Sequence, residues 1–236
     1  MITSILFDID DTIYNQMEPF SAACHAFPAL KNADLQALYA ARSVRSMEAL
    51  HSMEAGHLTL EENHIYRMQM ACQDLGISFS ASDALRFQAI YAEAQEHLQT
   101  TASMIAVLDF CKESGFFLGI ITNGPSSHQR KKFSILGLER WFPPAHVLVS
   151  GDCGWLKPDP QIFQLAQRQW KLTPNTTLYV GDSFAHDILG AQAVGWQSFW
   201  LNRRSNSLPA QAQAPSAQGL EAELLSYLKT QRKPAV

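Results

Sequence analysis

Short apolar stretches that alternate with helical patterns constrain the fold of this chain more than any other feature. Each stretch is rich in branched and aromatic residues and ends near Gly, Asp, Asn or Ser, which is typical of buried strands. The stretches are Ile2 to Ile9, Phe116 to Ile121, His146 to Val149, Thr177 to Val180 and Gln197 to Leu201. Helical patterns lie between the last four, at Ser126 to Leu136, Pro160 to Trp170 and Asp187 to Val194. Alternating strands and helices predict an α/β fold with a doubly wound parallel sheet.

The segment between the first two stretches, from about Tyr14 to about Thr100, contains no convincing strand. One amphipathic helical face runs from Leu58 to Leu75 and begins with the capping box Thr59-Leu60-Glu61-Glu62, and a second runs from Ala84 to Leu98. Helices with single apolar stripes need a common partner. We therefore expect a helical bundle inserted after the first strand.

This insertion explains the length of 236 residues, which is about one and a half typical domains. We predict a discontinuous α/β core domain at residues 1–14 and 101–236, and a helical cap domain at residues 15–100. The tail from Ser205 to Pro215 is rich in Pro, Ala and Gln, so we expect a surface loop there, followed by a short helix from Leu220 to Lys229.

Composition narrows the class of protein. Hydrophobic residues make up 47% and charged residues 17%, which excludes a long disordered polyelectrolyte. The net charge of −4 gives no basic excess for binding a nucleic acid polymer or an anionic membrane.

The four cysteines lie far apart in the sequence, which argues against a zinc site and a disulfide framework and predicts buried or partly buried thiols. No basic leader or long apolar run is visible, so we expect a cytoplasmic protein, and both a monomer and a homodimer stay open.

Polar residues follow four of the predicted strands, at the point where each strand ends. They are Asp8, Asp10 and Asp11 after the first strand, Thr122 and Asn123 after the second, Lys157 after the third, and Asp182 and Asp187 after the fourth. Because the carboxyl ends of parallel strands lie along one edge, we expect these side chains to converge. Carboxylates with one lysine and one hydroxyl suit phosphoryl transfer with a hard divalent cation, and a carboxylate can be the nucleophile.

The same residues resemble four motifs of the haloacid dehalogenase superfamily of phosphohydrolases, in the subgroup with a helical cap after the first strand. The resemblance rests on Asp8-Ile9-Asp10-Asp11-Thr12, Thr122-Asn123, Lys157-Pro158 and Gly181-Asp182-Ser183-Phe184-Ala185-His186-Asp187. Any one motif is weak, whereas four in order with fitting strands are specific. The resemblance implies a Rossmann-like core and Mg²⁺ as the cofactor.

The resemblance also implies roles for individual residues. Asp8 would attack phosphorus and bind Mg²⁺, and Asp10 would protonate the leaving oxygen and then activate water. The metal ligands would be Asp8, the Asp10 carbonyl, Asp182 and, directly or through water, Asp187. Thr122 Oγ and the Asn123 backbone N–H would bind phosphate oxygens, and Lys157 would offset the charge between Asp8 and the phosphate.

Asp10 separates activities within this family, since the dehalogenases carry an aromatic residue at that position. The sequence therefore favours a phosphatase that acts on a small phosphorylated metabolite, such as a nucleoside monophosphate or a sugar phosphate. A phosphomutase, a phospho-accepting receiver-like protein and an inactive binding protein stay open as alternatives.

The inserted helices are expected to act as a lid and to determine which substrate is accepted. We single out Arg67 as a substrate-binding residue. The further candidates are Arg42, Arg45, His51, His57 and His64, with Tyr14, Asn15 and Gln16 at the hinge. For each of them a solvated helix face or a structural hinge role is the simpler interpretation.

Overall fold

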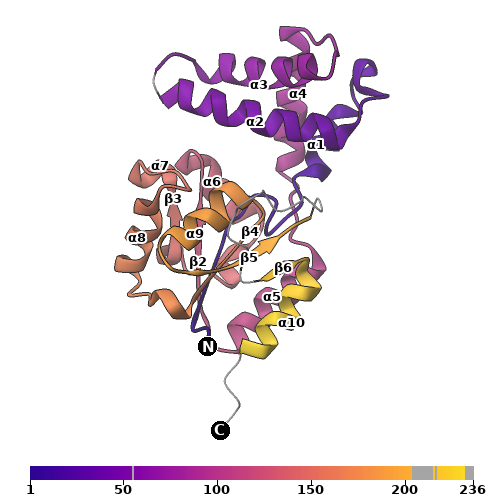
Figure 1. Cartoon of the computed structure of the whole chain (residues 1–236). Helices are drawn as coiled ribbons and strands as arrows, with labels where there is room; N and C mark the ends of the chain where they lie inside the picture. The colour runs from indigo at the N-terminus through magenta and orange to yellow at the C-terminus, as the bar shows by residue number, and fades with distance from the viewer. Residues whose placement is uncertain (55, 204–214, 216, 232–236) are drawn as a thin grey trace. The chain divides into compact units, whose positions relative to one another are not determined.

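A parallel sheet of six strands forms the centre of the computed structural model, which describes residues 1–54, 56–203, 215 and 217–231. The strand order is β3-β2-β1-β4-β5-β6, and every neighbouring pair is parallel. The strands are β1 (Ser4–Phe7), β2 (Phe117–Thr122), β3 (Val147–Val149), β4 (Thr177–Gly181), β5 (Gln197–Leu201) and β6 (Ala217–Gly219). The doubly wound sheet that the sequence predicts is confirmed (Figure 1).

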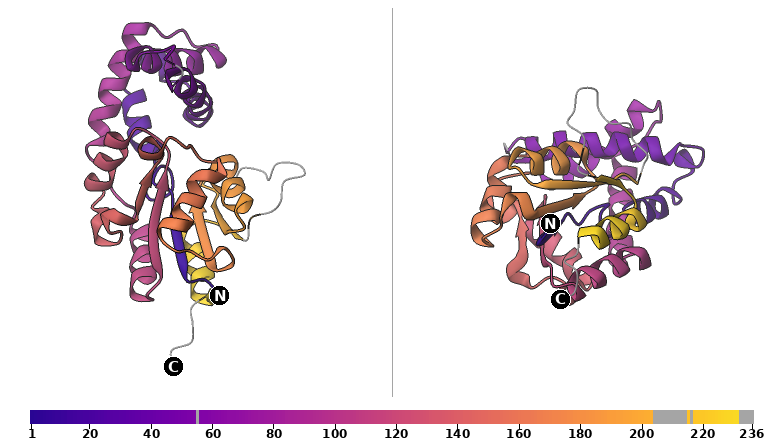
Figure 2. Two further views of the ribbon diagram at one scale, coloured as in Figure 1. Left: turned by 90° about the vertical axis from the view of Figure 1, so that its left-hand side faces the viewer. Right: turned by 60° about the horizontal axis from the view of Figure 1, so that its bottom comes forward.

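Helices cover both faces of this sheet, as Figure 2 shows in its right-hand view. They are α5 (Ala102–Glu113), α6 (Ser126–Ile135), α7 (Ser150–Cys153), α8 (Pro160–Gln169), α9 (Leu189–Ala193) and α10 (Glu221–Gln231). Helices α8 and α9 pack on the sheet through a buried cluster that includes Phe163, Tyr179 and Trp196. Helices α5 and α10 lie side by side on the other face. The core strands are therefore buried on both sides, which explains their nearly continuous apolar sequence.

Shorter helical turns join these elements. The 3₁₀ turns are η1 (Pro28–Leu30), η2 (Leu138–Arg140), η3 (Pro144–His146) and η4 (Pro174–Thr176), and η5 (Phe184–Ile188) is a π-helix. The helix predicted from Asp187 to Val194 thus begins as a π turn and continues as α9. Asp159 caps α8 by accepting from the Gln161 backbone N–H at 2.9 Å.

Four helices form the segment between β1 and α5. They are α1 (Met17–Cys24), α2 (Leu35–Glu54), α3 (Leu60–Asp74) and α4 (Ala81–Gln95). Their shared core includes Phe20, Leu38, Met68, Phe87 and Tyr91. The capping box at the start of α3 is confirmed, since Thr59 Oγ1 accepts from Glu62 N and Glu62 Oε2 accepts from Thr59 N. The inserted helical bundle of the predicted fold is also confirmed.

Contacts divide the chain into two compact units. Residues Met1–Asn15 and Gln99–Val236 make up one, which we call the α/β unit, and Gln16–Leu98 make up the other, the helical unit. The sequence-based boundaries were 15 and 100 for the helical segment.

Two features of the α/β unit differ from the sequence-based expectations. Strand β6 was not predicted, because Ala217, Gln218 and Gly219 have low strand propensity and pair with β5 through the backbone. The terminal helix α10 matches the predicted helix with shifted ends, whereas residues 205–214 of the expected surface loop lie outside the described residues. The cysteines are free, with three buried thiols and a partly buried Cys153, as predicted.

Candidate active site

Asp8 directly follows β1, the strand between β2 and β4. Its backbone N–H donates to Val180 O at 3.0 Å, which extends the pairing of β1 with β4 by one residue. The side chain is buried, and Oδ1 accepts a hydrogen bond from Lys157 Nζ at 2.8 Å. The carboxylate is therefore fixed in one orientation beside a cation, which suits a nucleophile.

Lys157 is held at both ends. Its backbone N–H donates to Asn123 Oδ1 at 2.8 Å, and Asn123 Nδ2 donates back to Lys157 O at 2.9 Å. The buried ammonium donates to Asp8, to Asp187 Oδ1 at 2.6 Å and to Tyr179 OH at 3.0 Å. Burial alone would lower the pKa of Lys157, but the carboxylates of Asp187 and Asp8 raise it well above its ordinary value. The lysine is thus a permanent positive charge between two carboxylates.

Asp187 occupies a site that the backbone shapes for it. Its Oδ2 accepts from the Ser183 N–H at 3.0 Å, while Oδ1 bonds Lys157. A Cβ added to Gly181 would lie 2.3 Å from Asp187 Oδ2, so only glycine leaves room for this carboxylate. The π-helix η5 carries Asp187 back toward the end of β4, which explains why this carboxylate reaches the site.

The structure brings three of the predicted metal ligands together. Carboxylate oxygens of Asp8, Asp182 and Asp187 all lie within 4.8 Å of one another. Oxygen ligands of this kind are preferred by Mg²⁺ and Ca²⁺. Lys157 bonds two of these three carboxylates, Asp8 and Asp187, and the cluster of oxygen donors fits a divalent cation.

The pKa of Asp8 reports the same excess of negative charge. Burial and the charges of Asp187 and Asp10 together raise this pKa to about 7, although Lys157 lowers it. A carboxylate that holds a proton near neutral pH needs more positive charge to ionise fully. A divalent cation at this cluster would supply that charge.

Asp10 has a different environment, with three donors and no carboxylate bonded to it among the described residues. Its Oδ1 accepts from Tyr14 OH and Lys132 Nζ, and its Oδ2 accepts from Gln129 Nε2 at 2.8 Å. Burial would raise the pKa of Asp10, but the charge of Lys132 and these hydrogen bonds lower it to about 2. Asp10 is therefore an ionised carboxylate at rest.

Thr122 and Asn123 follow one another where β2 ends. The Thr122 side chain is fully buried, and its Oγ1 has no hydrogen-bond partner within the described part of the chain. Buried hydroxyls are rarely left unpaired, so this donor fits a ligand oxygen. The Asn123 side chain is committed to Lys157, which leaves the predicted phosphate contact to its backbone N–H.

Several contributors escaped the sequence analysis. Gln129 and Lys132 lie on the buried face of α6 together with Phe133. Their spacing of three residues places both polar side chains on the core-facing side of the helix, and this pattern could have identified them from the sequence. Gln129 Nε2 also donates to Asn123 O, so it links Asp10 to the end of β2. Tyr179 was read as a strand residue, but its hydroxyl donates to Ile121 O and accepts from Lys157.

The predicted substrate-binding residue Arg67 belongs to the helical unit, on α3, where Nη2 donates to Gln88 Oε1 at 2.5 Å. Among the other candidates, Arg45 forms salt bridges within its own unit and His57 is exposed. The side chain of His51 lies outside the described residues. Tyr14, considered as a hinge contact, belongs to the α/β unit and bonds Asp10.

No helix among the described residues has the length and hydropathy needed to cross a bilayer.

The family model for haloacid dehalogenase-like hydrolases matches residues 2–195.

Individual proteins also match the chain. A glyceraldehyde 3-phosphate phosphatase from Methanopyrus kandleri is 30% identical over 86% of this chain and 85% of its own. A phosphoserine phosphatase from Thermus thermophilus is 35% identical over 42% of this chain and 39% of its own. The magnesium-bound structure of the putative hydrolase YfnB from Bacillus subtilis superposes with a TM-score of 0.69 at 24% identity, covering 96% of this chain and 98% of that one. Dehalogenases are among the other structures with this fold.

Proposed function

Because the chain belongs to the haloacid dehalogenase-like hydrolases, we propose that it is a Mg²⁺-dependent phosphatase acting through an aspartyl-phosphate intermediate on Asp8. The observation that carries this proposal is the cluster of Asp8, Asp182 and Asp187, in which Asp8 and Asp187 bond the buried Lys157. The substrate class is a small phosphate monoester, such as a sugar phosphate or a nucleoside monophosphate. The names of two relatives, phosphatases for glyceraldehyde 3-phosphate and phosphoserine, support this class.

In the first half-reaction an Asp8 carboxylate oxygen forms a bond to phosphorus while the ester P–O bond breaks. The leaving oxygen takes a proton from Asp10, which gained that proton from water in the second half-reaction of the preceding turnover. Since Lys132, Gln129 and Tyr14 hold Asp10 ionised at rest, these hydrogen bonds must loosen for Asp10 to act as the acid.

In the second half-reaction water attacks the phosphorus of the aspartyl phosphate, and the bond from phosphorus to Asp8 breaks. The Asp10 carboxylate takes a proton from that water, and its resting hydrogen bonds keep it in the ionised form that this step requires. Inorganic phosphate leaves, and the Asp8 carboxylate is regenerated.

Three further residues stabilise the charge that develops. Lys157 offsets the negative charge between Asp8 and the phosphoryl group, and Thr122 Oγ and the Asn123 N–H donate to its oxygens. When bound to Asp8, Asp182, Asp187 and the Asp10 carbonyl, Mg²⁺ supplies positive charge to the phosphoryl oxygens.

The experiment that tests this proposal measures phosphate release from a panel of phosphorylated metabolites, with Mg²⁺ and with EDTA. We expect hydrolysis that EDTA abolishes and that Asp8→Asn reduces at least about a thousandfold. The matched control is Asp152→Asn, because Asp152 pairs with Arg130 away from the cluster and its loss should leave the rate within about twofold. Circular dichroism checks that both variants fold.

Other outcomes of the same experiment would replace the proposal. Stable stoichiometric labelling by acetyl phosphate without turnover would identify a phospho-accepting protein. Transfer of phosphate between positions of a sugar bisphosphate would identify a phosphomutase. Release of halide from a haloacid would identify a dehalogenase, against the chemistry that Asp10 provides.

A further inference from the structure

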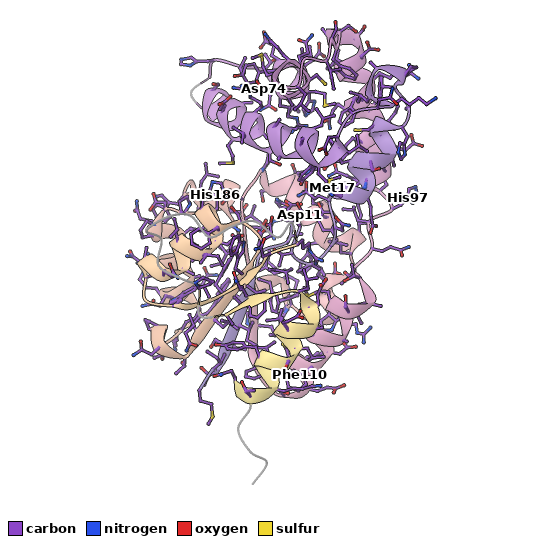
Figure 3. The ribbon with its side chains drawn as sticks, turned by 45° about the vertical axis from the view of Figure 1, so that its right-hand side comes forward. Asp11, Met17, Asp74, His97, Phe110 and His186 are labelled. Atoms are coloured by element: carbon purple, nitrogen blue, oxygen red, sulfur yellow. The ribbon has the colours of Figure 1, made fainter. Side chains whose placement is uncertain are left out.

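The turn that follows Asp10 has an uncommon backbone conformation. Asp11, labelled in Figure 3, has a φ of 55°, in the left-handed region that residues other than glycine rarely adopt. The backbone N–H groups of Thr12 and Ile13 both donate to Ile9 O, at 3.3 Å and 3.0 Å, which closes the turn. A residue in this conformation persists only where its surroundings hold it, and such residues are concentrated at functional sites.

Arg203, which lies two residues beyond the end of β5, holds this turn from a distant part of the chain. Its Nε donates to Asp11 O at 2.8 Å, and its Nη2 donates to Thr12 O at 2.9 Å. Hydrogen bonds from a charged donor are stronger than those between neutral groups, and the guanidinium group is a rigid planar fork. One side chain therefore fixes two successive carbonyl groups of the turn.

Arg203 is itself held through both its backbone and its side chain. Its backbone N–H donates to Leu201 O at 2.9 Å, and the preceding N–H, of Asn202, donates to Gly219 O of β6 at 3.1 Å. The Nη2 atom that bonds the turn also lies 2.7 Å from Oε1 of Glu221, whose side chain is 8% exposed. The guanidinium group is therefore fixed beside a buried carboxylate.

Glu221 connects this arginine to two helices. It is the first residue of α10, and its Oε1 accepts from Thr101 Oγ1 at 3.3 Å. Thr101 is the N-cap of α5 and accepts from the Met104 N–H at 3.2 Å. Since α5 and α10 lie side by side on one face of the sheet, Arg203 joins the turn after Asp10 to the scaffold of the α/β unit.

Two further arginines of the α/β unit provide a comparison. Arg130 pairs with Asp152 and Arg140 pairs with Asp109, and the two arginine side chains are 50% and 57% exposed. Exposed ion pairs of this kind contribute little to stability. Arg203 is only 18% exposed, and it donates to the backbone of a turn beside the candidate active site, so its contacts are not those of a surface ion pair.

We propose that Arg203 is a positioning residue, which holds the Asp11–Thr12 backbone so that Asp10 presents its carbonyl and its carboxylate in the geometry that the reaction requires. This role rests on the proposed function, in which the Asp10 carbonyl binds Mg²⁺ and the carboxylate transfers the proton. The Asp10 carbonyl and the Asp11 N–H share one planar peptide group, and the φ of Asp11 sets its rotation. By fixing the next two carbonyl groups, Arg203 fixes the framework against which this peptide group is oriented.

The first measurement compares two leaving groups in Arg203→Met at saturating Mg²⁺. p-Nitrophenolate leaves without a proton, whereas an alkyl phosphate needs the proton that Asp10 gives. For the alkyl phosphate that the wild type hydrolyses fastest, we expect kcat/KM to fall about tenfold more than for p-nitrophenyl phosphate, mainly through kcat. A merely structural arginine would lower the amount of folded enzyme and reduce both rates equally, and that result would overturn the proposal.

Two further variants accompany this measurement. Arg140→Met is the matched control, because it removes an exposed arginine of the same unit, and it should leave the ratio of the two kcat/KM values within about twofold. Arg203→Lys keeps the charge beside Glu221 but replaces the fork on two carbonyl groups by a single ammonium group. It should shift the ratio in the same direction by about threefold, and it supplies the comparison if Arg203→Met does not fold. An unchanged ratio in both Arg203 variants would overturn the proposal.

Calorimetric Mg²⁺ binding gives a readout that does not depend on turnover. Because the Asp10 carbonyl is one of the proposed ligands, Arg203→Met should weaken Mg²⁺ binding about tenfold, whereas Arg140→Met should not change it. If the wild type binds Mg²⁺ but hydrolyses no ester, the proposed function fails and the binding measurement still tests Arg203. If the wild type is active and Arg203→Met matches Arg140→Met in both measurements, the positioning role fails and the proposed function stands.

Discussion

The α/β unit and the helical unit each bury unbalanced charge, and the two imbalances have opposite signs. In the α/β unit three carboxylates cluster, and two of them, Asp8 and Asp187, bond Lys157. In the helical unit Arg42 and Arg67 share a core with aromatic rings and an amide, and no carboxylate of the described residues bonds them. A protein stabilised only by its own contacts would pair such groups, as the helical unit does for Arg45.

The opposite signs of the two charge clusters show which kind of ligand each unit could bind. The carboxylates of Asp8, Asp182 and Asp187 fit a divalent cation. Arg42 instead lies against aromatic rings, which attract a cation but accept no N–H hydrogen bond in the plane of the guanidinium group. The predictions below test whether each unit behaves as a site that lacks its ligand or as a structural cluster.

The largest effect is expected from removing the proton carrier of the α/β unit. Asp10→Asn should lower kcat by about a hundredfold to ten-thousandfold, because the amide can neither give nor accept the transferred proton. Mg²⁺ affinity should change far less, since the Asp10 carbonyl persists in the variant. Steady-state kinetics and calorimetric Mg²⁺ binding measure the two effects, and an equal loss of both would contradict the acid–base role.

The sharpest test of the comparison replaces one cation in each unit by methionine. Lys157→Met leaves Asp8 and Asp187 buried without their partner and should lower the free energy of unfolding by about 3–5 kcal/mol. Arg42→Met removes an unbalanced charge and keeps the packing on Tyr91, so we expect a change within about 1 kcal/mol. Urea unfolding of both variants measures the difference, and equal destabilisation would show that the two clusters are alike.

The pH dependence of Mg²⁺ binding comes next in size. The pKa of Asp8 is raised to about 7, so the folded state favours its protonated form, and stability from this group is present at low pH and lost as pH rises toward 7. Mg²⁺ must displace that proton. Its apparent affinity should therefore fall about tenfold per pH unit below pH 7 and level off above it. Calorimetry from pH 5 to pH 8 tests this, and a flat profile would exclude Asp8 as a ligand.

A smaller effect is expected at the residues that hold Asp10. Lys132→Met should lower kcat by about tenfold or less and raise the pKa of Asp10 toward its ordinary value, which moves the acidic limb of the pH–rate profile upward. The neighbouring exposed lysine provides the matched variant, Lys131→Met. If both variants give the same profile, Lys132 does not control Asp10.

The sequence predicts the sheet and the helical insertion because both depend on the pattern of apolar residues. Four of the five predicted strands are found within one or two residues at each end, and the fifth is identical. The apolar pattern does not predict β6, which forms through backbone pairing with β5, or η5, where a π turn takes the place of an α-helical turn.

Part of the candidate site could be predicted from the sequence, and part of it could not. Parallel strands place Asp8, Asp182 and Asp187 at one edge of the sheet, so their convergence follows from the fold. The partners of Asp10 do not follow from any pattern, since Gln129 and Lys132 reach it across more than a hundred residues of chain. Arg42 and Arg45 look equivalent in the sequence, and only the position of Asp74 in three dimensions distinguishes them.

The place of β1 in the sheet has a consequence for how the chain is made. This strand is synthesised first, but its neighbours β2 and β4 begin only at Phe117 and Thr177. All residues of the helical unit leave the ribosome before either neighbour, so that unit can fold while the strand preceding Asp8 is still unpaired. Asp8 is thus translated before both strands that flank its own, and β1 gains its second neighbour, β4, only after the helical unit and β2 have been made.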